Sequence, residues 1–238
     1  MKSPEDVCFG KDHKTKIQFP ATVNDTFKLP VSDKDTPFDV VGFGLNSMDH
    51  LCVAPEYPER GGKKEMVSYE QRAGGQVATA LTFVSRMGMK AKYIGKLGDD
   101  DFGRACREEL EKSGIDTTSV KTERGARNQF SVIIIDQQSG ERTVLTRREP
   151  GLDMRESELD ENALCRGRVV HMDGYDPASV KAVRLCRRKG IPVCLDLDAA
   201  VPGCRQLLES ADILIVSSHF PRMVTGIADP VEGLRSLR

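Results

Sequence analysis

Strand-like and helix-like segments alternate along most of this 238-residue chain, with short connections between them. A strand, a helix and a further strand in succession favour parallel pairing, with the helices packed on the sheet. We therefore predict an α/β fold with a Rossmann-like, mostly parallel sheet flanked by helices. The expected strands are 38–44, 91–95, 130–136, 143–146, 169–172, 193–197 and 213–216, and the expected helices are 76–87, 102–113, 177–189, 205–210 and segments beyond 216.

Two stretches rich in strand formers interrupt this alternation. Residues 50–73 contain Pro55, Pro58 and two adjacent glycines, which oppose a continuous helix. Residues 126–149 contain two strand-like runs joined by a polar, glycine-containing turn, as in a hairpin. Because neither stretch fits a layer of strand–helix units, we predict that together they form a small β-sheet lid beside the main domain.

Residues 1–36 differ from the rest in composition and pattern, with three prolines, many charges and no sustained apolar periodicity. We expect an N-terminal extension there that is partly disordered, and a single α/β domain over residues 37–238. No apolar stretch has the features of a signal peptide or the length of a membrane span. A cytoplasmic location without a membrane partner is the expectation.

Charge and cysteine usage narrow the class of partner. The 35 Lys+Arg and 36 Asp+Glu nearly cancel and form no long basic run, so we expect a small-molecule partner and no nucleic acid. The seven cysteines include no Cys-x-x-Cys pair, which favours reduced thiols over disulfides or zinc. His50 and His171 stand apart from any ligand pattern, so no metal site is expected among these residues.

The glycines of Gly42-Phe43-Gly44 follow the pattern of a dinucleotide-binding turn only in part. Such a turn needs a third glycine, where Ser47 stands, and then a helix whose N-terminus meets the pyrophosphate. The following segment instead carries prolines. A nicotinamide or flavin dinucleotide is therefore not expected.

A longer constellation is more informative. It consists of Asn46 and Asp49 after the first strand, Ala73-Gly74-Gly75-Gln76 opening a helix, Gly98-Asp99-Asp100 before the next helix, and Gly140-Glu141-Arg142-Thr143 in the hairpin. In this order and spacing the set resembles the ribokinase/PfkB carbohydrate kinase family, from about Phe38 to the end of the chain. Thr79 replaces the asparagine usual in ribokinases, which makes the branch with sulfofructose kinase and ketohexokinase closest in pattern.

The resemblance implies an ATP-dependent kinase that phosphorylates an alcohol group of a sugar or sugar derivative, with ATP and Mg²⁺ as cofactors. The substrate-binding residues that it implies are Asn46, Asp49, Gly74, Gly75, Gln76, Thr79 and Asp173. The residue chemistry agrees, because a carboxylate accepts from two adjacent hydroxyls and ligands gather at the carboxyl ends of parallel strands. Two alternatives stay open: Asp49 could cap a turn, and the family's amide residue aligns with either Asn46 or Ser47.

Other charged residues have simpler interpretations. Asp99 and Asp100 are expected to cap the helix that begins near Phe102. Arg142, Arg147 and Arg148 form either a solvated face of the hairpin or a clasp for an anionic group on the substrate.

Two departures from the family pattern bear on activity. Ser217-Ser218-His219-Phe220 stands where many members have Asn-x-x-Glu, and no Gly-Ala-Gly-Asp sequence occurs in the 238 residues. In the family that second motif supplies the general base and an anion hole. The resemblance thus places the base beyond Arg238, implies that the C-terminal part of the fold is missing, and predicts that this truncated chain is inactive by itself, with no catalytic residue of its own. The alternative function is that of a non-catalytic sugar-binding or regulatory protein. In either case, two copies could form a homodimer through the lid.

Overall fold

The computed structural model describes residues 36–201 and 204–237. The expected N-terminal extension therefore lies outside the described residues, apart from Thr36. Within the described residues, no helix has both the length and the apolar character needed to cross a bilayer.

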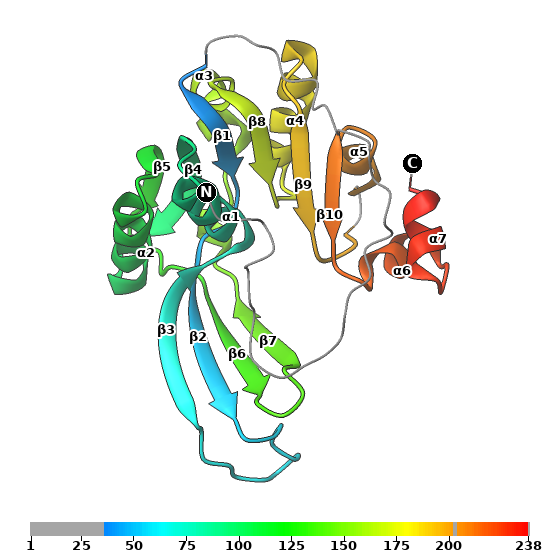
Figure 1. Ribbon diagram of the computed structural model, residues 1–238. Coiled ribbons are helices and arrows are strands. Elements are labelled where there is room, and N and C mark those ends of the chain that lie inside the picture. The colour runs from blue at the N-terminus through cyan, green and yellow to red at the C-terminus, as the bar shows by residue number, and fades with distance from the viewer. Residues whose placement is uncertain (1–35, 202–203, 238) are drawn as a thin grey trace, which may run out of the picture.

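A six-stranded sheet forms the centre of the body (Figure 1). Its strands are β1 (Phe38–Phe43), β4 (Ala91–Gly98), β5 (Asp116–Glu123), β8 (Gly167–Met172), β9 (Val193–Leu197) and β10 (Ile213–Val216). They follow the order β10-β9-β8-β1-β4-β5, and every neighbouring pair is parallel. The predicted α/β architecture is confirmed.

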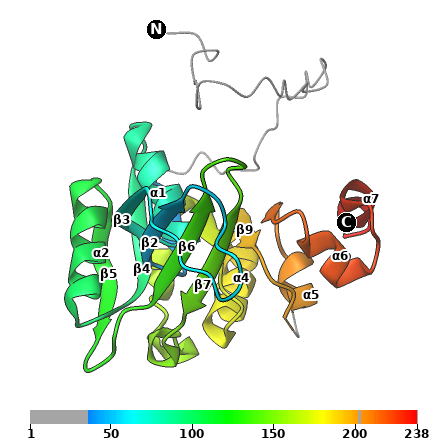
Figure 2. The same cartoon turned by 90° about the horizontal axis from the view of Figure 1, so that it is seen from below.

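Helices cover both faces of this sheet (Figure 2). They are α1 (Gln76–Arg86), α2 (Asp101–Lys112), α3 (Glu161–Leu164), α4 (Pro177–Lys189) and α5 (Cys204–Leu208). Two short helices, α6 (Phe220–Thr225) and α7 (Pro230–Arg235), contact each other beyond the β10 edge of the sheet (Figure 1). Successive side chains of β1 point to opposite faces of the sheet, so they reach the hydrophobic core on each face in turn. Val41 and Phe43 pack in the cluster with α3 and α4. Gly42 points to the other face, where a Cβ would lie 2.5 Å from Leu81 of α1. The glycine thus lets α1 pack directly on the strand.

A second, four-stranded sheet projects beyond the carboxyl ends of the main sheet (Figure 1). It contains β2 (Ser47–Ala54), β3 (Ser68–Gly74), β6 (Phe130–Asp136) and β7 (Arg142–Arg147), in the order β3-β2-β6-β7. The pair β2–β6 is parallel, whereas β2–β3 and β6–β7 are antiparallel. We call this mixed sheet the lid. Its first strand begins at Ser47, so the polar residues after β1 lie on a strand rather than in a loop.

The start of α2 separates the two aspartates that were expected to cap it. Asp100 is the N-cap, and its side chain accepts hydrogen bonds from the amides of Gly103 at 3.0 Å and Asn128 at 3.1 Å. That prediction is confirmed. The prediction for Asp99 is wrong, because its carboxylate accepts from the amide of Gly125 at 2.9 Å and so holds the turn before β6.

Candidate functional site

Polar residues gather beside the first turn of α1, where β1 ends, β2 begins and β3 ends. β1 leads through Gly44 and Asn46 into β2, and β3 leads through Gly75 into α1. These two connections between body and lid therefore pass the same place. Asp173, which follows β8, reaches the same place from the main sheet.

Asp49 lies on β2 with its carboxylate facing the last residue of β3. Its Oδ1 accepts a hydrogen bond from Ser47 Oγ at 2.6 Å. Its Oδ2 approaches Gly74 so closely that a Cβ there would lie 1.9 Å away. Glycine at position 74 thus makes room for this carboxylate, which keeps part of its surface exposed.

Gly75 is the residue before α1, and its φ of 93° belongs to the region that favours glycine. A Cβ there would also lie 2.8 Å from the Cα of Asn46. Gly75 has no side chain to cap this helix end, and Asp173 accepts from one amide of the first turn, that of Val77. The first turn of α1 therefore presents backbone N–H groups beside Asp49 and Gly74, as a site for hydroxyl or anionic oxygens requires.

Asp173 joins three elements at this point. Its Oδ1 accepts from the amide of Leu45 at 2.9 Å, and its Oδ2 accepts from the amide of Val77 in α1 at 3.4 Å. A Cβ at Gly44 would lie 1.9 Å from the same carboxylate, so a side chain there is excluded. Burial raises the pKa of Asp173 to about 7, although the two amides and Arg148 act in the opposite direction. Near neutral pH this carboxyl group can hold or release a proton.

The next strand contributes a neighbouring carboxylate. Gln76 donates from Nε2 to Asp196 Oδ1 at 2.9 Å, which links α1 to the end of β9. Burial raises the pKa of Asp196, and burial lowers the pKa of His171, so the buried imidazole favours its neutral form. Thr79 lies one turn further along α1, with an exposed side chain.

The structure separates Asn46 from Ser47, the two residues between which the sequence left a choice. The Asn46 side chain is fully buried, and its amide oxygen and nitrogen have no hydrogen-bond partner among the described residues. Gln129 holds its backbone carbonyl instead, at 2.8 Å. Ser47 contacts Asp49 directly, so its hydroxyl is the better placed of the two to act with that carboxylate.

Sequence reasoning missed Tyr93 in this cluster and named Ser47 only as an alternative to Asn46. Tyr93 is fully buried on β4 and donates its hydroxyl to the carbonyl of Gly44 at 2.7 Å, which fixes the connection from β1 to the lid. Ser47 looked like a missing glycine in the sequence. Its spacing of two residues from Asp49 on a strand was the available signal, since such residues share a face.

Metal-ligating side chains do not cluster in the described parts of the chain. No group of three or more His, Cys, Asp or Glu residues is placed to hold a metal ion within residues 36–201 and 204–237.

A family model for pfkB family carbohydrate kinases matches residues 38–235, nearly the whole described region. The chain belongs to the pfkB family of carbohydrate kinases. A probable fructokinase-7 of Arabidopsis thaliana is 26% identical over 225 residues, which cover 86% of this chain and 64% of the plant protein. The chain thus spans less than two thirds of the length of that relative.

Solved structures agree with the pfkB assignment. A putative ribokinase of Agrobacterium tumefaciens has a TM-score of 0.76 and is 28% identical, over 84% of this chain and 66% of the other. The ribokinase of Arabidopsis thaliana complexed with ribose and ATP has a TM-score of 0.66 over 84% of this chain and 68% of the other. At 18% identity, this second likeness shows the fold alone.

The departure of this pfkB chain after β10 has a structural counterpart. Ser217 and Ser218 follow β10, and Phe220, where many members have a carboxylate, is fully buried in the core at the start of α6. A buried phenyl ring offers no ligand to a phosphate-bound cation. This turn therefore lacks the carboxylate that the family pattern would supply.

Proposed function

We propose that this chain forms the sugar-binding part of an ATP-dependent carbohydrate kinase, which phosphorylates a hydroxyl group of a sugar or sugar derivative. The observation that carries the proposal is the contact between the Asp49 carboxylate and Gly74 beside the start of α1, where the N-cap residue Gly75 has no side chain. It supports a role for seven residues in substrate binding, namely Asn46, Asp49, Gly74, Gly75, Gln76, Thr79 and Asp173.

Asp49 would orient the sugar. Its Oδ1 is already held by Ser47, which leaves Oδ2 and the remaining lone pairs to accept from adjacent hydroxyl groups. The backbone N–H groups of α1 would donate to oxygens on the same sugar. For Asn46, whose buried amide has no hydrogen-bond partner among the described residues, an oxygen of the sugar would supply one.

Asp173 would lie at the floor of the site as a carboxyl group whose protonation state changes near neutral pH. Its pKa of about 7 and its 2% exposure place a titrating carboxyl group beneath the β1–β2 connection. In its charged form it holds the amides of Leu45 and Val77, and in its neutral form it can donate a hydrogen bond. We propose that it positions the β1–β2 connection and the first turn of α1 for the substrate.

Phosphoryl transfer needs groups that we place outside the described residues. ATP would supply the phosphoryl group and Mg²⁺ would bridge its phosphates. Because the 238 residues contain no Gly-Ala-Gly-Asp sequence, we propose that the chain binds sugar but does not form ADP by itself. A cytoplasmic location remains a prediction.

The test is calorimetric titration of the chain with D-fructose and D-ribose, comparing the wild type with Asp49→Asn. This change keeps the shape of the side chain but removes the charge from its hydrogen bonds. Hydrogen bonds to charged groups contribute about 1.5–3 kcal/mol, so the Kd should rise at least about tenfold. Asp153→Asn is the matched control, because Asp153 is exposed and lies outside the cluster.

The alternative roles of Asp49 give a different result. If it only caps a turn, Asp49→Asn should lower the melting temperature while the sugar affinity stays that of the wild type. A protein that has become a sugar sensor without kinase activity would keep this binding too. The presence or absence of a Gly-Ala-Gly-Asp sequence in the gene downstream of Arg238 distinguishes the two functions.

We also propose that two copies pair through the lid face that carries Asp49. Leu51, Val53 and Ile133 share this face with Val144, which is 46% exposed. Val144→Lys should shift the chain to monomer in sedimentation velocity. Leu145→Lys is the control on the opposite face, where the residue is 58% exposed. Equal effects of both changes would contradict the proposal.

A further inference from the structure

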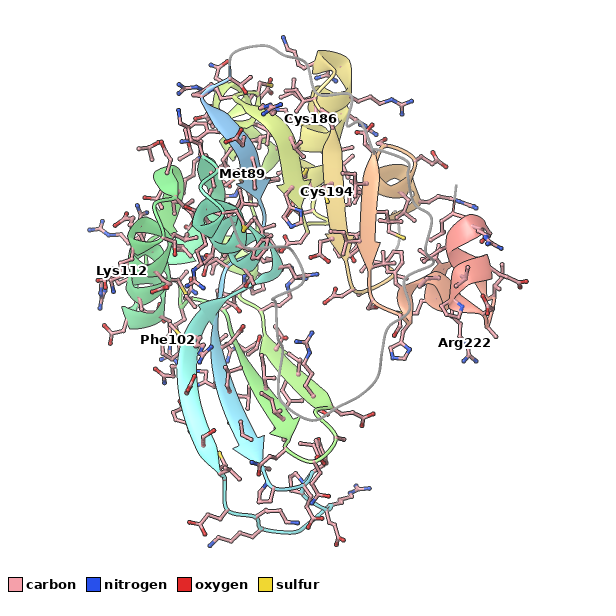
Figure 3. The ribbon with its side chains drawn as sticks, viewed as in Figure 1. Met89, Phe102, Lys112, Cys186, Cys194 and Arg222 are labelled. Atoms are coloured by element: carbon pink, nitrogen blue, oxygen red, sulfur yellow. The ribbon has the colours of Figure 1, made fainter. Side chains whose placement is uncertain are left out.

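A pocket of about 240 Å³ lies where the first turn of α2 meets the base of the lid. Phe102 marks this junction in Figure 3. Phe102 of α2 and Phe130 of β6 line the pocket together with Arg127 and Arg147. The pocket is thus lined both by the body and by the two strands of the lid's second hairpin, β6 and β7.

This pocket is distinct from the Asp49 cluster. Phe130 pairs with Met48 on one side and with Arg147 on the other, whereas Asp49 pairs with Ser131. Neighbouring residues along a strand point to opposite faces of the sheet. Phe130 and Arg147 therefore lie on the face opposite to Asp49.

The apolar part of the pocket is aromatic. The ring centroids of Phe102 and Phe130 are 6.2 Å apart, and the planes meet at 64°, an edge-to-face contact. His50 packs against both rings, with centroids at 5.4 Å and 5.6 Å. Both phenylalanines keep part of their surface exposed although they lie at a packed junction. That surface is open to an apolar group in the pocket.

The charged part of the pocket contains two arginines without a carboxylate partner. In the described parts of the chain, no acidic group lies within ion-pair distance of Arg127 or Arg147. Their guanidinium groups are exposed at the pocket.

The acidic residues of the pocket form no ion pair with these arginines in the described parts of the chain. Asp100 accepts from two backbone amides, and Asp101 forms an ion pair with Arg104. The Glu149 carboxylate has no hydrogen bond or ion pair among the described residues. Asp100 and Glu149 balance the two arginines in total charge, but a carboxylate between the guanidinium groups would give each of them the ion pair that it lacks among the described residues.

We propose that this pocket binds a small organic monoanion with an aromatic or apolar body. Its carboxylate would lie between Arg127 and Arg147, since a guanidinium group matches a carboxylate in geometry, and its body would lie on Phe102 and Phe130. The volume equals about eight water molecules at about 30 Å³ each, below the size of drug-like sites. A molecule of benzoate size fits this space. Its binding would fasten the lid to α2.

The test is titration of the 238-residue chain with benzoate, followed by calorimetry and by the amide resonances of Phe102 and Phe130. Saturable binding with shifts at both resonances is expected. Arg127→Ala and Arg147→Ala should each raise the Kd about tenfold, because each removes a charge-assisted hydrogen bond. The matched controls are Arg124→Ala in the same turn and Arg142→Ala on the opposite face of β7, and both should bind benzoate like the wild type.

Two further probes test the charge and the aromatic ring of the ligand separately. Benzyl alcohol keeps the ring without the charge, and acetate keeps the charge without the ring. Both should bind at least about tenfold more weakly than benzoate. Equal binding of benzyl alcohol would overturn the anionic assignment, and equal binding of acetate the aromatic one. Absence of saturable benzoate binding, or equal losses in the pocket and control variants, would overturn the site itself.

Discussion

Replacing Gly74 with alanine tests whether the Asp49 carboxylate binds the sugar, because Gly74 on β3 makes room for this carboxylate on β2. The new Cβ would lie 1.9 Å from Asp49 Oδ2 and 2.6 Å from its carboxyl carbon. The backbone at Gly74 is not in the left-handed region, so alanine is compatible with the strand itself. The substitution therefore acts on Asp49 rather than on the backbone of β3.

The size of the effect follows from the distance. Ordinary contact begins near 3.4 Å, so the carboxylate must move by about 1.5 Å, the difference from 1.9 Å. A shift of that size breaks the hydrogen bond of 2.6 Å from Ser47 and removes the acceptor from its place beside α1. Losing one hydrogen bond between sugar and carboxylate should cost about 1.5–3 kcal/mol, or at least tenfold in Kd.

Stability should change far less than affinity. Alanine in place of glycine restricts the unfolded chain and contributes about 0.4–1 kcal/mol to stability, which offsets part of the lost contact with Ser47. For a chain of this size, 1 kcal/mol corresponds to about 2–4 °C in melting temperature.

The assay is sugar titration by calorimetry beside thermal unfolding, with Gly151→Ala as the control. A Cβ at Gly151 would meet no atom closer than 3.8 Å. If Gly74→Ala binds D-fructose and D-ribose as the wild type does, the Asp49 carboxylate is not a sugar ligand and the reasoning fails. A melting temperature lowered by more than about 10 °C would instead show that the substitution disrupts the lid.

Two further predictions concern stability. The pKa of Asp173 is raised to about 7 in the folded chain, so between pH 4 and 7 the folded chain keeps a proton that the unfolded chain has lost. The free energy of unfolding should therefore fall by up to about 4 kcal/mol as the pH rises through this window. Asp173→Asn should flatten this dependence in urea unfolding at pH 4.5 and 7.5, and an unchanged slope would contradict the assignment. Asp100→Ala should lower the free energy of unfolding by about 1–2 kcal/mol through loss of the α2 cap, whereas the exposed Asp101→Ala should change it by less than about 0.5 kcal/mol. Equal losses in urea unfolding would exclude the capping role.

The sequence predicted the main sheet well because its strands are apolar and bounded by glycines or helices. It missed β5, whose residues Asp116–Glu123 are mostly polar. That strand lies at the edge of the sheet, where one side faces solvent and no continuous apolar run is needed. The start of β2 was also missed, because Ser47 and Asp49 look like loop residues until they are paired with β3.

The sequence could name candidate residue types for the site but not the contacts between them. Asp49 and Gly74 meet because the register of β2 and β3 pairs Ser47 with Gly74, and sequence alone does not fix that register. The burial of Asp173 beneath the β1–β2 connection depends on packing between β1, β8 and α1. Its raised pKa follows from that burial, so no local pattern could have indicated it.

The order of strands in the lid also has a consequence for how the chain folds. Its central pair, β2–β6, joins Met48 to Phe130, and the intervening chain contains α1, β4, α2 and β5. Each hairpin alone is marginally stable in water, and the parallel pairing between them closes a long loop. The lid should therefore assemble after the body has brought the ends of β1 and β5 together. The residues of the Asp49 cluster would then acquire their arrangement in the last stage of folding, so a chain with an unfinished body cannot present this cluster in its formed state.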